Sequence, residues 1–275
     1  MRRIIKKATI TAQIAWPGLA DLKFALLRAY RGLLSQPHEQ RFSVLRVLSF
    51  PDAGLLLDIG GDMGQSVASL RIYCPQSPIV SFEPNPLSSA RIERRFRGDP
   101  QVRVQRIALG DQDGEFPLYI PAYKYTTFPE LGTLDRTQAE NWLSERIYGY
   151  NHANLTVLEV RCRVHRLDSL ALAPVLVKID CRCNASAIIL GGSDTLGKSK
   201  AALLLEAASL SQPAQEIVQR HGYRQFAHLN GTFREVHGTE RCDLLVTGEN
   251  LTRLLASALA QPDATGVSLT VEASE

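Results

Sequence analysis

Residues 54–66 read GLLLDIGGDMGQS. A short, continuously apolar run ends at Asp58, and glycines follow at positions 60, 61 and 64. Short apolar strands are typical of a sheet that is buried on both faces. A strand, a glycine turn and a helix in succession let backbone N–H groups approach a ligand closely. The stretch therefore predicts the first strand of an α/β sheet, with a ligand site at its end.

Similar apolar runs recur along the rest of the chain. They lie at 77–85, 102–111, 175–180, 201–207 and 242–248. Segments long enough for a helix separate most of them, at 65–75, 86–97, 185–200 and 211–222. This alternation predicts an α/β, Rossmann-like fold with a doubly wound, mainly parallel sheet.

The chain divides into three parts by its patterns. We expect an N-terminal helical cap at 1–50, the α/β domain at 51–250, and a C-terminal helix and tail at 251–275. Apolar residues at helical spacing in 18–34 and 39–49 predict the helices of the cap. Residues 114–150 interrupt the alternation: GEFPLYIP at 114–121 predicts an extra strand, and the part that follows it is rich in aromatic residues. Insertions of this kind tend to lie above the carboxyl ends of the strands, so we expect this one on the acceptor side of a site.

The charge of the chain is concentrated near its start. The net charge is +3, but residues 1–50 hold nine basic and two acidic residues, a net charge of +7. We interpret this excess as a solvated helix face, with weak contact to a membrane surface as the alternative, and we expect no nucleic-acid partner. Neither a signal peptide nor a spanning segment is evident, and five scattered cysteines fit a reducing compartment. We therefore expect a cytoplasmic protein.

The glycine spacing discriminates between cofactor classes. The dinucleotide fingerprint G-x-G-x-x-G would place glycines at positions 60, 62 and 65, which hold Gly60, Asp62 and Gln65. A nicotinamide or flavin cofactor is therefore disfavoured. An aspartate at position 62 is compatible with a tight turn, because Asp is among the side chains most often found at positive φ.

The second predicted strand ends in Phe82-Glu83-Pro84-Asn85-Pro86. An acid at the tip of this strand can accept hydrogen bonds from both hydroxyls of a ribose. Glu83 follows Asp58 by 25 residues, about the length of one βαβ unit. The alternative is that Glu83 is only a polar strand end, but its pairing with the glycine turn favours a ligand role.

These motifs together resemble the FkbM family of methyltransferases. The resemblance covers roughly residues 45–250 and rests on LLLDIGGDMGQS, SFEPNP, RIALGDQDGEFPLYI, VHRLDSL, VKID and HGY. It implies a class I methyltransferase domain, S-adenosylmethionine as methyl donor, and O-methylation of a hydroxyl on a small metabolite or sugar. The implied cofactor-binding residues are Asp58, Gly60, Gly61, Gly64, Glu83, Pro84, Asn85, Ile107 and Ala108.

Asp180 is the candidate catalytic residue. It ends the strand at 175–180, on the same sheet edge as Asp58 and Glu83, where it would position the acceptor or remove its proton. The alternative is that it caps the next helix or holds a loop. The family pattern continues from this aspartate with Glu-Gly two residues on, whereas this chain has Arg182 and Cys183.

The sequence also permits two other functions. The departure at 182–183 permits a relative that binds the cofactor but no longer transfers a methyl group. A nicotinamide-dependent oxidoreductase is the less favoured third possibility. We predict no metal site, because two cysteines one residue apart supply too few ligands and no nearby Cys/His pair completes a set.

Overall fold

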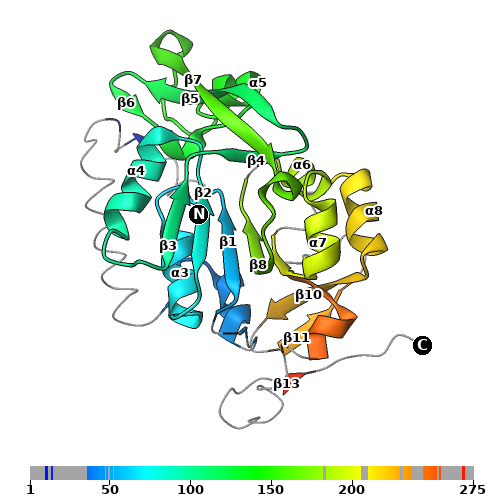
Figure 1. Ribbon diagram of the computed structural model, residues 1–275. Coiled ribbons are helices and arrows are strands. Elements are labelled where there is room, and N and C mark those ends of the chain that lie inside the picture. The colour runs from blue at the N-terminus through cyan, green and yellow to red at the C-terminus, as the bar shows by residue number, and fades with distance from the viewer. Residues whose placement is uncertain are drawn as a thin grey trace.

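The structure is a computed structural model. It describes residues 10, 11, 14, 36–46, 48, 50, 51, 53–181, 184–205, 210–229, 232–236, 244–252, 254, 268 and 269. Two sheets and a set of surrounding helices make up this part of the chain (Figure 1).

The larger sheet contains nine strands. In spatial order they are β13 (Ser268–Leu269), β11 (Thr232–Glu235), β10 (Tyr223–Leu229), β12 (Leu244–Thr247), β9 (Ala202–Leu204), β8 (Pro174–Ile179), β1 (Leu55–Ile59), β2 (Ile79–Phe82) and β3 (Val102–Gln105). Strands β3, β2, β1, β8 and β9 run parallel to one another, and β12 runs antiparallel to both of its neighbours. From β3 to β10 this is the strand order of a class I methyltransferase, with the last strand inserted antiparallel. The predicted fold class is confirmed.

Helices cover both faces of this sheet, as the continuous apolar runs require. The helices are α3 (Gln65–Tyr73), α4 (Pro86–Arg95), α6 (Ala185–Leu190), α7 (Ser193–Ser199) and α8 (Gln212–Arg220). Leu56 of β1 packs in one apolar cluster with Val67 and Leu70 of α3, whereas its neighbour Leu57 packs in a second cluster with Ile188 of α6. Figure 1 shows α3 and α4 on one side of the sheet and α6, α7 and α8 on the other.

A second sheet stands at one end of the first. Its strands, in spatial order, are β4 (Ala108–Gly110), β7 (Leu155–Arg166), β5 (Gly114–Tyr123) and β6 (Thr126–Thr127). Strands β5 and β7 pair antiparallel over ten residue pairs, from Gly114 opposite Val164 to Tyr123 opposite Leu155. The prediction of one strand over 102–111 was wrong, because β3 ends at Gln105 and β4 belongs to this second sheet. Between β6 and β7 lie η2 (Pro129–Leu131), α5 (Arg136–Asn141) and η3 (His152–Asn154).

The segment before β1 is described from residue 36. The helix expected at 39–49 is a 3-10 helix, η1 (Gln40–Arg46), and its Phe42, Val44 and Leu45 are buried in the apolar cluster that contains Leu56. The helix expected at 18–34 lies outside the described residues, as does most of the predicted C-terminal helix and tail. Within the described part of the chain, no helix combines the length and the apolarity that crossing a bilayer requires.

Candidate active site

The glycine turn after β1 brings the backbone close to β8. Gly60 has a φ of +79°, and its N–H donates to the carbonyl of Phe82 at 2.9 Å. A Cβ atom at Gly60 would lie 2.5 Å from the carbonyl oxygen of Asp180, so only glycine fits there. Asp62 also has a positive φ, of 46°, which agrees with the expected tolerance of aspartate at that position.

A buried ion pair lies beneath this turn. Asp58 is 0% exposed; its Oδ2 accepts from Ser81 Oγ at 2.8 Å, and its Oδ1 lies 2.9 Å from Lys178 Nζ. Lys178 is 1% exposed and also donates to the carbonyl of Gly60 at 2.8 Å. Burial is the largest single effect on the pKa of Lys178 and lowers it, but the charges of Asp58 and Asp180 and the hydrogen bond to Asp58 together outweigh burial, so the net effect is a raised pKa. The pair therefore fixes the turn from below.

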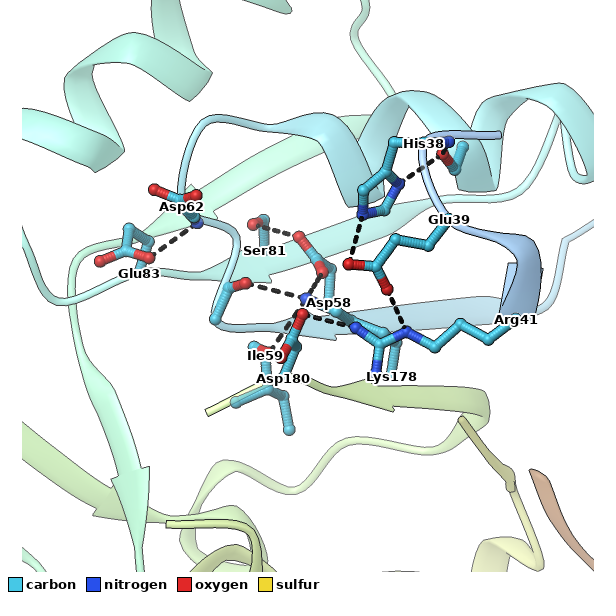
Figure 2. Close-up of polar contacts among 12 residues, drawn as sticks. His38, Glu39, Arg41, Asp58, Ile59, Asp62, Ser81, Glu83, Lys178 and Asp180 are labelled. Carbon is cyan, nitrogen blue, oxygen red and sulfur yellow. Dashed lines mark hydrogen bonds and ion pairs between the residues drawn. The ribbon is translucent and has the colours of Figure 1, made fainter. Parts of the chain in front are cut away.

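Glu83 connects the turn to the end of β2. Its Oε2 accepts the backbone N–H of Asp62 at 2.8 Å (Figure 2). Its Oε1 accepts the backbone N–H of Asn85 at 2.9 Å. The side chain is 8% exposed, and burial raises the pKa of its carboxyl to about 7, although both N–H donors lower it. Glu83 thus holds the loop after β1 and the loop after β2 together, and its side chain lies between them.

Asn85 joins the helix that follows to the insertion. Its Oδ1 accepts the N–H of Leu87 and caps α4, and its Nδ2 donates to the carbonyl of Pro129 at 2.9 Å. The amide is therefore fully engaged in holding η2 against the start of α4.

These elements enclose a cleft of about 360 Å³ at the carboxyl ends of the strands. Clefts of this volume hold small molecules. The predicted residues that line it are Gly60, Glu83, Pro84, Asn85, Ile107, Ala108 and Asp180. The predicted contacts Asp58, Gly61 and Gly64 do not line it: Asp58 lies beneath the turn, and the Cβ position of Gly61 is occupied by Ser81 and Ile92. A cofactor contact by any of these residues stays a prediction.

The lining of the cleft has two chemical characters. Ile107, Ala108, Leu109 and Leu118 form its apolar part. Its ionisable side chains, apart from the Cys181 thiol, are the five carboxylates Asp62, Glu83, Glu130, Asp135 and Asp180. The lining contains no Lys, Arg or His, so within the described residues the cleft suits an apolar ring and a cationic group.

Several lining residues were not predicted individually. The insertion contributes Leu118 from β5 and residues 129, 130 and 132–135. Asn184, just before α6, also lines the cleft and donates from Nδ2 to the carbonyl of Leu109 at 2.8 Å. The sequence signal for these residues is a group of turn-forming residues, Pro129, Gly132 and Asp135. Such a group predicts a loop, but it does not predict that the loop lies against the cleft.

Asp180 follows β8 directly and lines the cleft. Its N–H donates to the carbonyl of Ile59 at 3.0 Å, which places it beside the glycine turn. Its Oδ2 accepts from Arg41 Nη2 at 2.5 Å (Figure 2). The departure at Arg182 and Cys183 lies outside the described residues.

Cys181 is the next residue after Asp180. Burial raises the pKa of its thiol to about 12, so it is an inert thiol at neutral pH. Among the described residues, no three His, Cys, Asp or Glu side chains are arranged to hold a metal ion.

Two curated proteins are similar to this chain in sequence. The AMB antimetabolite synthetase AmbE of Pseudomonas aeruginosa is 28% identical over an alignment of 220 residues that covers 67% of this chain and 10% of that protein. Methyltransferase 1 of Beauveria bassiana is 26% identical over an alignment of 142 residues that covers 49% of this chain and 54% of that protein. The chain thus spans about a tenth and about half of the lengths of these relatives. No family model matches it.

Two solved structures are similar to this chain. The methyltransferase FkbM of Methylobacillus flagellatus KT is 15% identical with a TM-score of 0.46, over 72% of this chain and 44% of that one. The precorrin-6y C5,15-methyltransferase of Geobacter metallireducens GS-15 is 14% identical with a TM-score of 0.38, over 75% of this chain and 84% of that one. Since both scores are below 0.5, neither likeness carries the proposals that follow.

Proposed function

We propose that this protein is an S-adenosylmethionine-dependent methyltransferase. The observation that carries the proposal is the cleft itself, whose described lining combines an apolar wall with five carboxylates and no basic side chain. S-adenosylmethionine has an adenine ring, a ribose with two hydroxyl donors, and a cationic sulfonium and ammonium. The lining offers a complementary group for each of these parts.

The residues present fit that cofactor. The wall of Ile107, Ala108 and Leu118 suits the adenine ring. Each carboxylate oxygen of Glu83 holds one backbone N–H and has a lone pair left for a ribose hydroxyl. Asp180, beside the glycine turn, suits the cationic end of the cofactor.

The bound cofactor would supply an electrophilic methyl group, and the protein would mainly align donor and acceptor. Asn85 holds η2 over the cleft through Pro129, so the insertion forms the wall opposite the strand ends. Glu130, Thr133 and Asp135 in that wall carry oxygens that can accept hydrogen bonds from a hydroxyl-bearing acceptor. We therefore propose O-methylation of a small metabolite or sugar.

The charge of the cleft disfavours the dinucleotide alternative. The pyrophosphate of a nicotinamide cofactor carries two negative charges, and the described lining offers no cation to balance them. Together with the glycine spacing of the sequence, this makes oxidoreductase activity the weaker proposal.

A second candidate function is cofactor binding without methyl transfer. The observation that favours it is the contact between Asp180 and Arg41. An arginine beside a carboxylate favours its charged form, which makes the carboxylate a poorer proton acceptor.

Calorimetry and a transfer assay distinguish these functions. We expect S-adenosylmethionine and S-adenosylhomocysteine to bind the purified protein, and NAD not to bind. Transfer of radiolabelled methyl to any member of a panel of hydroxyl-bearing sugars and metabolites would favour the methyltransferase. Binding without transfer across the panel would favour the second candidate, and absence of binding by both sulfur compounds at millimolar concentration would exclude both.

A further inference from the structure

Arg41 does not line the cleft, but it contacts Asp180, which does. It is 139 residues from Asp180, yet its Nη2 lies 2.5 Å from Asp180 Oδ2. It belongs to η1, which precedes the first strand of the central sheet. The segment before the α/β domain therefore contacts a residue that lines the cleft.

The guanidinium is held on its other side as well. Arg41 Nε lies 2.6 Å from Glu39 Oε2, and Glu39 Oε1 lies 3.9 Å from His38 Nε2. His38 in turn contacts Ser69 Oγ of α3 through Nδ1, at 2.8 Å, and through its backbone N–H, at 3.0 Å. Figure 2 shows this series of contacts running from α3 to the end of β8.

The pair of Arg41 and Asp180 differs from an ordinary surface ion pair, because only one of its two side chains is exposed. Exposed pairs contribute little to stability, because both side chains are mobile and solvated. Arg41 is only 11% exposed, whereas Asp180 is 42% exposed. The residues that follow Arg41 are anchored in the core, with Phe42 0% exposed. The arginine is thus the fixed partner, and the carboxylate is the one whose orientation is set.

We infer that Arg41 is a positioning residue that orients Asp180 toward the cationic end of the cofactor. This inference rests on the proposed function, because it assigns to Asp180 a role in binding S-adenosylmethionine. Asp180 borders the glycine turn through its hydrogen bond to Ile59 and lines the cleft. The guanidinium fixes the direction of the Asp180 carboxylate, which can then attract the positive charge at that end of the cofactor.

A double-mutant cycle on cofactor affinity tests this role. The variants are Arg41→Gln, Asp180→Asn and the pair, each titrated with S-adenosylmethionine by calorimetry. We expect each single substitution to weaken binding about tenfold, which is on the order of one charge-assisted hydrogen bond. Because Arg41 acts through Asp180, the pair should also be weakened about tenfold, whereas independent effects would give about a hundredfold.

Two further variants separate positioning from loss of structure. Arg46→Gln removes an exposed arginine from the same 3-10 helix and should bind like wild type. Arg41→Lys keeps the charge and should recover part of the affinity. Wild-type affinity in Arg41→Gln, or an additive pair, would overturn the inference alone. Failure of the wild type to bind the cofactor would remove the proposed function and the inference with it.

Discussion

Lys178 Nζ lies 2.9 Å from Asp58 Oδ1, and both side chains are buried beneath the glycine turn. The same ammonium donates to the carbonyls of Ile59, at 3.3 Å, and Gly60, at 2.8 Å. Neighbouring parallel strands β1 and β8 contribute the two charges, with Asp58 directly opposite Lys178 in the register. The pair thus fixes the shape of the turn on which the proposed cofactor site is built.

We predict that Lys178→Met lowers the free energy of unfolding by about 3–5 kcal/mol, because it leaves Asp58 charged and buried without a partner. Urea unfolding followed by circular dichroism measures the change. The matched control is Lys198→Met on the exposed surface of α7, which should change stability by less than about 0.5 kcal/mol. Equal stabilities of the two variants would contradict a structural role for the pair.

The double variant Asp58→Leu with Lys178→Met tests the same pair differently. Replacing both charges by apolar groups removes the desolvation penalty. We expect this variant to be more stable than Lys178→Met alone. A double variant less stable than Lys178→Met would show that other contacts of Asp58, such as its hydrogen bond from Ser81, contribute more than the desolvation penalty costs.

Gly60→Ala should destabilise the protein and weaken cofactor binding. An L-residue at a φ of +79° costs about 1–2 kcal/mol, and the new Cβ would lie 2.5 Å from the Asp180 carbonyl oxygen. Gly98→Ala is the control, since nothing lies within 4 Å of a Cβ there. Thermal unfolding compares the two; a Gly60→Ala variant as stable as Gly98→Ala would disprove the close approach of β8.

Glu83 should make stability depend on pH. Its folded pKa of about 7 lies above the ordinary value of 4.5, so the folded state binds the proton more tightly. The resulting stability is fully present below pH 4.5 and is lost as the pH rises through 7, on the order of 3 kcal/mol. The difference in unfolding free energy between wild type and Glu83→Gln, measured from pH 4.5 to 8, should decline accordingly. A flat difference would show that the carboxyl is not buried as described.

Glu83 should also set the pH dependence of cofactor affinity. Ribose hydroxyls donate more strongly to a carboxylate than to a protonated carboxyl, so S-adenosylmethionine should bind more tightly as the pH rises through about 7. Glu83→Ala should weaken binding tenfold or more at pH 8 and abolish this dependence. An unchanged affinity in this variant would remove Glu83 from the site.

The central sheet was predictable from the sequence because its signals are local. The apolar run at 54–60 predicts β1. The strand is apolar on both faces because Leu56 packs in one buried cluster and Leu57 packs in another. The pairing of β5 with β7 was not predictable, because it joins residues as far apart as Gly114 and Val164 through an irregular segment. The strand at 114–121 was therefore predicted, but its membership of a second sheet was not.

The site residues at the ends of strands were predictable from the sequence, whereas the contacts that depend on packing and register were not. Glu83 and Asp180 end apolar runs, so parallel pairing brings them to one sheet edge. The contact of Arg41 with Asp180 depends on how η1 packs, and no local pattern encodes it. Asp58 resembles a ligand residue by its motif, but its burial against Lys178 depends on the register of β1 and β8.

Calorimetric titration of the purified wild-type protein at pH 8 with S-adenosylmethionine and with NAD tests whether the cleft binds the proposed methyl donor. We predict saturable binding of S-adenosylmethionine with one site per chain, because one cleft combines the apolar wall with the five carboxylates. We predict no binding of NAD under the same conditions. Binding of NAD, or no heat of binding with S-adenosylmethionine at millimolar concentration, would contradict a methyltransferase site in this cleft.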